Sequence, residues 1–441
     1  MYTVAQAKAY IAGGALDARL EGLYGCCGEA LAPYRTRLTD AVDAFVQQYG
    51  SRFACPPDEI PVQIFSVSGR TELGGNHTDH QHGRVLAAGV SLDVIAVASP
   101  VAEPVIAVKS EGYPEDVIST DDLSVQENEI GRSAALIRGT AALFAERNIS
   151  VGGFVAYTTS SVLKGSGLSS SAAFEVMLGA VCNHFFAQDA LSLDTLAIIA
   201  QGVENRYFGK PCGLMDQMAC ALGGVVAIDF ADPAKPVWEQ VTLDFAKEGY
   251  AFCIIDTGGD HADLTDDYAA IPAEMKAVAA QLGAAVLRDA DEDAFRANLP
   301  AIRAACGDRA VMRAIHFFDD NNRVPKQIAA LAEGRFDDYL RMVTESGRSS
   351  LANLQNIFSC RHPQQQAVTL TLALCERFLA GRGACRVHGG GFAGTVQAYV
   401  PAEECEAFRK AMDSVLGEGA CHVLNIRREG AAVLLPSAYN P

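Results

Sequence analysis

Apolar and polar positions in the first half of the chain change period several times, which predicts strands mixed with helices. Residues 1 to about 55 repeat their apolar positions at helical spacing, and Pro56-Pro57 ends that segment. Four later runs alternate, or are rich in Val and Ile, as strands are. They are 62–69, 85–100, 103–110 and 152–160. Helical spacing returns in three runs, which are 132–148, 168–187 and 193–209. Residues 212–230 are expected to form a loop that passes into a strand.

The second half of the chain mixes the same two patterns less regularly. Residues 250–257 and 394–401 have strand patterns, and 365–380 has a long helical pattern. Because these runs do not form a regular strand–helix–strand series, they favour an α+β fold over a doubly wound α/β fold. The segment DPAKPVW, 232–238, holds two prolines and is the best candidate for a boundary. We therefore predict two domains, residues 1–230 and 231–441.

Composition narrows the class of protein. Hydrophobic residues make up 49% of the 441 positions and charged residues 20%, which is typical of a well-cored globular protein. The net charge is 35 − 53 = −18, and no basic run could follow a phosphate backbone, so we expect no nucleic-acid partner. The N-terminal residues lack the layout of a signal peptide, and no stretch approaches about 18 uninterrupted apolar residues, so we expect no membrane span. The 13 cysteines form no CxxC pair, which indicates reduced thiols in a cytoplasmic protein.

A His-rich segment, GGNHTDHQHG, occupies residues 74–83. It holds His77, His80, His82 and Asp79 within six positions, with glycines on both sides. Such a group could bind a metal ion, recognise a substrate or form a solvated turn. The segment alone leaves all three open.

A glycine- and serine-rich segment, KGSGLSSSAAFEV, follows at residues 164–176. Its glycines let the backbone approach a ligand, and the start of a helix presents free N–H groups to an anion, which suits phosphates. It is not a Walker A loop, because no Lys-Ser/Thr pair follows the second glycine at the required place. A serine-capped core helix would have the same residues.

Two more segments carry candidate chemistry. GVENRYFGKPCGLMDQ, 202–217, places Glu204 late in a predicted helix and Asp216 in a predicted loop. One carboxylate could hold Mg²⁺ while the other faces a reacting hydroxyl, although each alone could be a solvated or capping acid. CRVHGGGFAGTVQAYV, 385–400, has three consecutive glycines before a strand, which a plain turn would also explain.

Together these segments resemble the GHMP small-molecule kinases, and within them the galactokinases. The family's first motif, G-R-V-N-L-I-G-E-H-T-D-Y, corresponds to GRTELGGNHTDH, residues 69–80. Its G-x-G-L-S-S-S-A-A motif is intact at 165–173, and its A-E-x-x-y-v-G-x-x-C-G-I-M-D-Q block corresponds to 203–217. The block G-A-R-M-T-G-G-G-F-G-G corresponds to GACRVHGGGFAG, 383–394, in which His388 and Ala393 are substitutions.

The resemblance implies a two-domain fold with mixed sheets, and an active site between the domains that uses ATP and Mg²⁺. ATP would lie over a loop at a helix N-terminus, made of Gly165, Ser166, Gly167, Leu168, Ser169, Ser170, Ser171 and Ala172. Glu204 and Ser171 would hold the Mg²⁺. Asp216 would face the sugar's anomeric hydroxyl, with Arg70 beside it keeping its carboxylate ionised. The other implied sugar contacts are Asn76, His77, Asp79, His80 and Tyr268.

Departures from the motifs leave the sugar open between two candidates. The family's Glu before H-T-D, which meets the sugar's C6 hydroxyl, is Asn76 here, and its Tyr after H-T-D is His80. These changes remove a negative charge and add an imidazole, which a C6 carboxylate would tolerate. Plant galacturonate 1-kinases also lose that Glu and carry D-H-Q, as residues 79–81 do. The Arg-Arg pair that usually follows the family's tyrosine is missing after Tyr268. We favour galactose, with galacturonate as the alternative.

Two other classes of function compete with a kinase. Some family members bind galactose and ATP as non-catalytic sensors, but they lack part of the serine–alanine run that is whole here. A metalloprotein using the His-rich segment is the second. No motif indicates an oligomeric state, and we take a monomer as the simplest expectation.

Overall fold

A computed structural model of the chain describes residues 1–163, 167–259 and 264–436. Its larger sheet has nine strands. They are β1 (Tyr2–Thr3), β2 (Pro61–Gly74), β3 (Arg84–Val101), β4 (Val105–Ser110), β5 (Glu115–Ser119), β6 (Gly153–Ser160), β7 (Val225–Asp229), β8 (Val237–Val241) and β13 (Ala431–Val433). The main order is β1-β2-β3-β6-β4-β5, with β13 on β2 and β7 between β3 and β8. Pairing is antiparallel except for β4 with β6. The Val- and Ile-rich β2 and β3 are the long, buried central strands.

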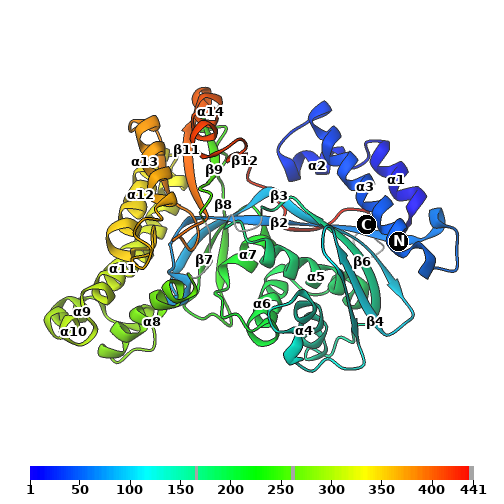
Figure 1. The fold of residues 1–441 in the computed structure, drawn as a ribbon, viewed down its shortest axis with the longest axis horizontal. Coiled ribbons are helices and arrows are strands. Elements are labelled where there is room, and N and C mark those ends of the chain that lie inside the picture. The colour runs from blue at the N-terminus through cyan, green and yellow to red at the C-terminus, as the bar shows by residue number, and fades with distance from the viewer. Residues whose placement is uncertain (164–166, 260–263, 437–441) are drawn as a thin grey trace.

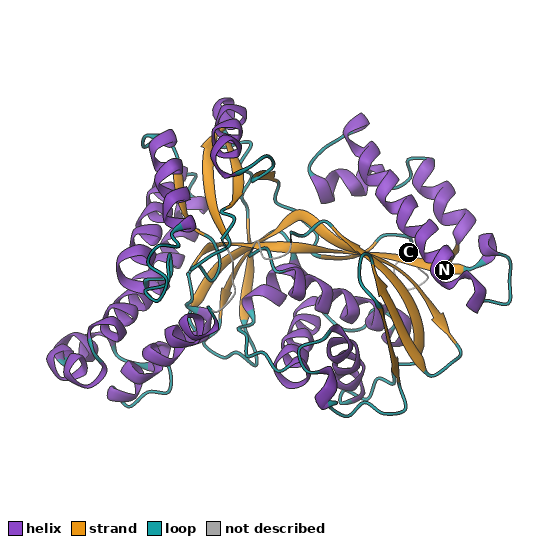
Figure 2. Ribbon diagram, viewed as in Figure 1, coloured by secondary structure: helices purple, strands orange, loops and turns teal. Residues whose placement is uncertain are grey.

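Helices cover both faces of this sheet, as Figures 1 and 2 show. One face carries α1 (Val4–Ala12), α2 (Asp17–Tyr24) and α3 (Ala32–Tyr49), whose apolar residues form one core with the sheet. The opposite face carries α4 (Ser133–Ala145), α5 (Ser170–Ala187), α6 (Leu193–Val203) and α7 (Met215–Leu222), which share the largest apolar core. The helices α5 and α7 both pack on β2, so their N-terminal residues can meet the polar residues of that strand.

The second half of the chain builds a smaller antiparallel sheet of order β10-β11-β9-β12. Its strands are β9 (Tyr250–Asp256), β10 (Ala384–Val387), β11 (Thr395–Pro401) and β12 (Cys421–Leu424). The helices of this half are α8 (Thr265–Gln281), α9 (Glu292–Ala297), α10 (Leu299–Cys306), α11 (Asp308–Ala332), α12 (Phe336–Ser349), α13 (Ala367–Leu379) and α14 (Cys405–Leu416). They lie at the other end of the larger sheet from α1–α3 (Figure 1). No helix in the described ranges is long and apolar enough to cross a membrane.

The mixed sheets and their helices confirm the predicted α+β class. One prediction was wrong: residues 215–222 form helix α7, so Asp216 lies in the first turn of a helix and not in a loop. Glu204 begins a π-helical turn, Glu204–Phe208, that directly follows α6. Residues on both sides of the predicted domain boundary, after residue 230, belong to the larger sheet. Strand β8 pairs with β7, and β13 pairs with β2. The change of sheet lies between β8 and β9.

Candidate active site

The centre of the site is an ion pair between strand β2 and helix α7. Nε and Nη2 of Arg70 donate to the two carboxylate oxygens of Asp216, each at 2.6 Å. Arg70 is 5% exposed, and Asp216 is half-buried. Burial alone would raise the pKa of Asp216, but the charge and hydrogen bonds of Arg70 hold that pKa below its usual value. Arg70 thus lies beside Asp216, as predicted, and the lowered pKa favours the ionised carboxylate.

The serine-rich loop meets this pair at the start of α5. Ser169 donates from Oγ to Oδ2 of Asp216 at 2.5 Å, and it holds a left-handed φ of 57°. A serine in that backbone conformation is strained, which is common where the surrounding structure fixes a functional side chain. Arg70 also donates to the carbonyl of Gly167, and the Arg70 amide bonds the Leu168 carbonyl at 3.0 Å. The guanidinium therefore joins the carboxylate to the loop.

The rest of the predicted phosphate loop begins the helix. Gly165 and Ser166 lie outside the described residues. Ser170 is half-buried and Ser171 exposed, so both hydroxyls can reach a ligand. Leu168 and Ala172 are buried, and each can offer only its backbone to one. Free N–H groups at the N-terminus of an 18-residue helix attract phosphate.

A second cluster of carboxylates lies under the loop. Glu204 is buried; it pairs with Nζ of Lys210 at 3.0 Å and accepts from Nε2 of Gln217 at 2.9 Å. Gln217 also donates to Glu175 at 3.1 Å. Burial and the nearby Glu204 raise the pKa of Glu175 to about 8.

The donors of this cluster fit Mg²⁺. One oxygen each of Glu175 and Gln217 is buried with no hydrogen-bond partner among the described residues, and oxygen ligands are those that Mg²⁺ prefers. Among the described residues no group of three or more His, Cys, Asp and Glu side chains is arranged to hold a metal by itself. That suits an ion that one carboxylate, a hydroxyl and substrate phosphates hold together.

The His-rich segment forms a tight loop after β2. His77 has a left-handed φ of 60°, and its Nε2 lies 2.9 Å from the carbonyl of Gly390. Burial and the neighbouring His80 lower the pKa of His77 to about 3, so its ring is neutral and donates to that carbonyl. The His80 ring is half-buried, with its centroid 6.0 Å from that of His77. His77 is thus part of a contact between loops, which weighs against metal binding by this segment.

Asp79 is the carboxylate of this loop that faces the ion pair. It is half-buried and close enough to Arg70 to raise the pKa of that guanidinium. A Cβ on Gly213, just before α7, would overlap Oδ2 of Asp79, so the two segments touch. No hydrogen bond joins the Asp79 side chain to another residue within the ranges that the structure describes. A carboxylate left in this way can accept hydrogen bonds from hydroxyl groups of a ligand.

Tyr268 and the glycine block close the site from the second half of the chain. The Tyr268 hydroxyl donates to the carbonyl of Gly391 at 2.6 Å, and its ring meets Phe392 edge-on, with centroids 5.2 Å apart. A Cβ on Gly390 would lie 2.6 Å from the Tyr268 ring, so only glycine lets the ring pack there. The block thus holds both Tyr268 and His77.

Two family models match the segments of the chain that hold most of this site. Residues 135–224 match the family described as GHMP kinases N terminal domain, and residues 43–100 match the Galactokinase galactose-binding signature. The chain is 27% identical to the galactokinase of Streptomyces coelicolor over 376 residues, which cover 84% of this chain and 93% of that protein. It is 28% identical to the galactokinase of Glaesserella parasuis, over 79% of this chain and 88% of that one. The chain is thus similar to galactokinases of the GHMP kinase group.

Solved structures of GHMP kinases share the fold. Lactococcus lactis galactokinase, solved in complex with galactose, superposes with a TM-score of 0.74 at 23% identity, over 89% of this chain and 99% of that one. Methanococcus jannaschii mevalonate kinase superposes with a TM-score of 0.57 at 16% identity, over 82% and 98%.

One residue of the family's sugar motif is placed differently from our expectation. Asn76 is fully buried, and its side-chain amide bonds only protein groups. The predicted contact of Asn76 with a sugar stays a prediction, and in this arrangement the side-chain oxygen and nitrogen already have protein partners. The physical reason is that Asn76 lies against Glu72, a buried carboxylate that itself pairs with the buried Arg386.

Several residues of this galactokinase-family site were not found from the sequence. They are Lys210, Gln217, Glu175 and Arg386. Lys210 and Gln217 lie inside the block 203–217, where proximity to Glu204 was a usable signal. Glu175 is an acid among apolar residues of α5, which was a second signal. Arg386 lies inside the block 383–394, but its partner Glu72 is 314 positions away, so no local pattern indicates their pairing.

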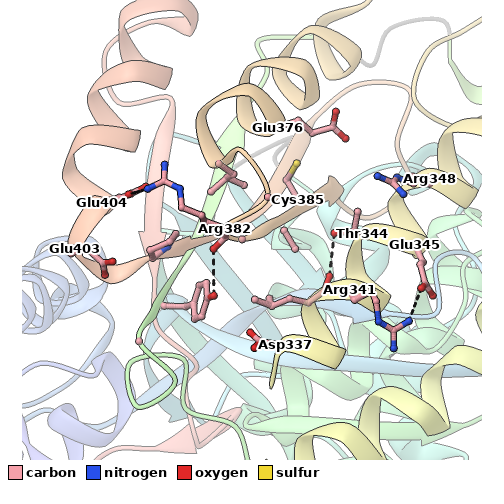
Figure 3. Close-up of a pocket in the computed structure, with 18 residues that line it drawn as sticks. Asp337, Arg341, Thr344, Glu345, Arg348, Glu376, Arg382, Cys385, Glu403 and Glu404 are labelled. Carbon is pink, nitrogen blue, oxygen red and sulfur yellow. Dashed lines mark hydrogen bonds and ion pairs between the residues drawn. The ribbon is translucent and has the colours of Figure 1, made fainter. Parts of the chain in front are cut away.

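A large surface pocket lies apart from this site. Its volume is about 1070 Å³, and it lies between α12, α13 and the edge strand β10 (Figure 3). Two ion pairs lie along it, Arg341 with Glu345 and Arg382 with Glu404. The predicted catalytic, sugar-binding, phosphate-binding and metal-binding residues that the structure describes are not among those that line it.

Proposed function

We propose that the protein is a galactokinase, which transfers the γ-phosphate of ATP to the anomeric hydroxyl of galactose. The observation that carries this proposal is the Arg70–Asp216–Ser169 arrangement, with the carboxylate of Asp79 facing it. It joins an ionised carboxylate, a phosphate-binding helix start and a free sugar-binding acid. The family, and relatives named galactokinase that match over most of the chain, support the same reaction.

In this mechanism the anomeric hydroxyl lies against Asp216. The carboxylate orients the hydroxyl and accepts its proton as the anomeric oxygen bonds to the γ-phosphorus, while the bond from that phosphorus to the oxygen of ADP breaks. Arg70 holds the carboxylate in its charged form and lies beside the phosphate in transfer. The N-terminus of α5 and the hydroxyls of Ser170 and Ser171 bind the phosphates.

Glu204 and Ser171 would hold Mg²⁺, which neutralises phosphate charge when it is bound. Lys210 pairs with Glu204 and so gives that buried carboxylate a counter-charge. The ammonium is largely exposed, so it can move when ATP and the ion enter.

Galacturonate is the second candidate acceptor. The loop of residues 75–83 contains a single acid, Asp79, and three histidines, so the loop repels a C6 carboxylate less than the family motif with its additional Glu. We place galactose first because the sugar-binding signature covers residues 43–100 and the matched relatives are named for galactose.

A sugar panel tests the proposal. ADP release is measured with ATP, Mg²⁺ and each of galactose, galacturonate, N-acetylgalactosamine and arabinose, and ³¹P NMR identifies an anomeric phosphate in the product. We expect the highest kcat/KM for galactose. A higher kcat/KM for galacturonate than for galactose would identify galacturonate as the preferred acceptor. If the protein bound ATP and sugar but released no ADP in response to sugar, a non-catalytic sensor would be favoured over a kinase.

A further inference from the structure

Two residues of the first motif have exchanged places in this chain. The motif G-R-V-N-L-I-G-E-H-T-D-Y has Asn at its fourth position and Glu at its eighth, where this chain has Glu72 and Asn76. The two side chains are in contact. Nδ2 of Asn76 lies 3.1 and 3.2 Å from the carboxylate oxygens of Glu72. The exchange therefore keeps one carboxylate and one amide within a single cluster.

The partner of the displaced carboxylate is Arg386, on strand β10 of the smaller sheet. Its Nη2 pairs with Oε1 of Glu72, and both side chains are 2% exposed or less. Arg386 also donates to Ser346 Oγ at 3.0 Å and to the Val387 carbonyl at 3.1 Å. A buried guanidinium that loses its counter-charge destabilises the fold strongly, so Arg386 requires a carboxylate at this place. Glu72 supplies it from β2, in the other sheet.

Asn76 connects this pair to the loops that surround the site. Its Nδ2 also donates to the carbonyl of Gly389 at 2.8 Å. Its Oδ1 accepts from Ser350 at 3.1 Å and from Asn356 at 3.0 Å. The backbone amide of Asn76 donates to Asp320 at 2.9 Å. Every polar group of Asn76 is thus used in fixing the sugar loop against the second half of the chain.

The next residue links this cluster to the site. His77 bonds the carbonyl of Gly390, one position after the glycine that Asn76 bonds. Gly390 packs on the ring of Tyr268, and Asp79 lies two residues beyond His77. A shift of Asn76 would therefore move the glycine block and the sugar loop together.

We propose that Glu72, Asn76 and Arg386 act as one exchanged unit of positioning residues that holds the sugar loop against the glycine block and so sets the affinity for the sugar. This inference rests on the proposed function for its kinetic part. With Glu at 76 alone, two carboxylates share one guanidinium. With Asn at 72 alone, Arg386 has no counter-charge. Only the exchange of both restores one carboxylate, one amide and one guanidinium.

A double-mutant cycle tests the unit. The variants are Glu72→Asn, Asn76→Glu and the exchange variant that carries both. Glu239→Asn, at an exposed position of β8, is the control for the loss of one carboxylate. Each variant is measured for KM of the sugar, KM of ATP, kcat and the midpoint of urea unfolding.

We expect each single variant to raise the sugar KM by about tenfold or more and to lower the unfolding midpoint. The exchange variant should return the sugar KM to within about threefold of wild type, because the coupling between neighbours is not additive. The KM of ATP should change by less than about threefold in all variants, and the control should match wild type. The proposal would be overturned if the effects were independent, so that the fold-increase in sugar KM of the exchange variant equalled the product of the fold-increases of the two single variants.

The proposal can still be tested if a single variant does not fold or if wild type has no kinase activity. If a single variant does not fold, the exchange variant alone decides: a near-normal unfolding midpoint supports the unit and failure to fold overturns it. If wild type phosphorylates no sugar, the proposed function fails, whereas the coupling in the unfolding midpoints still tests the unit.

Discussion

Arg70 and Asp216 lie 146 positions apart in the sequence and form a bidentate pair in which both N···O distances are 2.6 Å. The first residue comes from a central strand and the second from the first turn of a helix that packs on it. Ser169 adds a third hydrogen bond to the same carboxylate from the phosphate loop. The pair thus fixes the orientation of the carboxylate and its charge, and both should be measurable in kinetics.

Replacing Asp216 by Asn should abolish phosphate transfer. The amide keeps the size of the side chain but cannot accept the hydroxyl proton, so kcat should fall by about 10²–10⁴-fold. ATP should still bind with near-normal affinity, because the phosphate loop is unchanged. Coupled assay of ADP release and calorimetric titration with ATP measure the two. Turnover close to wild type would exclude the role given to Asp216.

Arg70→Lys separates the charge of Arg70 from its geometry, and Arg70→Met removes both. Lysine cannot form the bidentate pair, so kcat should fall by about 10²-fold, with a larger loss for methionine. Because Arg70 lowers the pKa of Asp216, that pKa should rise in both variants, and more with methionine. The acidic limb of the kcat–pH profile should therefore move to higher pH in the same order. Profiles that coincide with wild type would show that Arg70 does not control this ionisation.

The parts that were predicted correctly are those with local signals. Runs with a marked composition, such as the Val- and Ile-rich runs that became β2 and β3 and the long apolar run that became α5, indicate their element type within a few neighbouring residues. Helix α7 was missed because it has only eight residues, of which seven are buried, and so short a run cannot be assigned to a helix from its period alone. The partial positive charge of its N-terminus suits Asp216 in the first turn.

In the site, too, residues within local motifs were named from the sequence, whereas contacts between distant residues were not. Asp216, Arg70 and Asp79 were named from motif letters, and the structure brings them together. Asn76 was expected to contact the sugar, and the structure shows that its hydrogen-bond partners include distant residues such as Asp320 and Asn356. A single sequence has no signal for contacts made across more than 200 positions. The burial of Asn76 therefore required the fold.

Replacing His77 by Gln should make the protein less sensitive to acid. The folded protein keeps His77 neutral down to about pH 3, whereas an unfolded chain protonates histidine below about pH 6.5. The unfolded state thus binds more protons between these values, and the free energy of unfolding falls as pH falls, by up to about 1.4 kcal/mol per pH unit. Glutamine does not titrate and can still donate to the Gly390 carbonyl.

Urea unfolding at several values between pH 7 and pH 4 measures this difference. The difference in free energy of unfolding between the His77→Gln variant and wild type should shift in favour of the variant as pH falls. Parallel pH dependences in the two proteins would show that His77 does not lose its proton affinity on folding.

Replacing Gly213 by Ala should weaken binding of the sugar selectively. The new Cβ would overlap Oδ2 of Asp79 and lie 2.9 Å from its Cγ, so the carboxylate must move. The backbone of Gly213 does not have a left-handed φ, so alanine itself adds no strain there. Because the Arg70–Asp216 pair and the phosphate loop are not touched, the sugar KM should rise by about tenfold, with little change in the KM of ATP.

Two further variants make that result specific to Asp79. Gly22→Ala, where a Cβ meets no atom within 4 Å, should behave as wild type. Asp79→Ala removes the carboxylate that the new methyl group displaces, so adding Gly213→Ala to it should cause no further loss. A further rise in the sugar KM in that double variant would mean that Gly213 acts on the sugar through some group other than Asp79. A sugar KM for Gly213→Ala equal to that of wild type would mean that Asp79 does not bind the sugar from the position seen here.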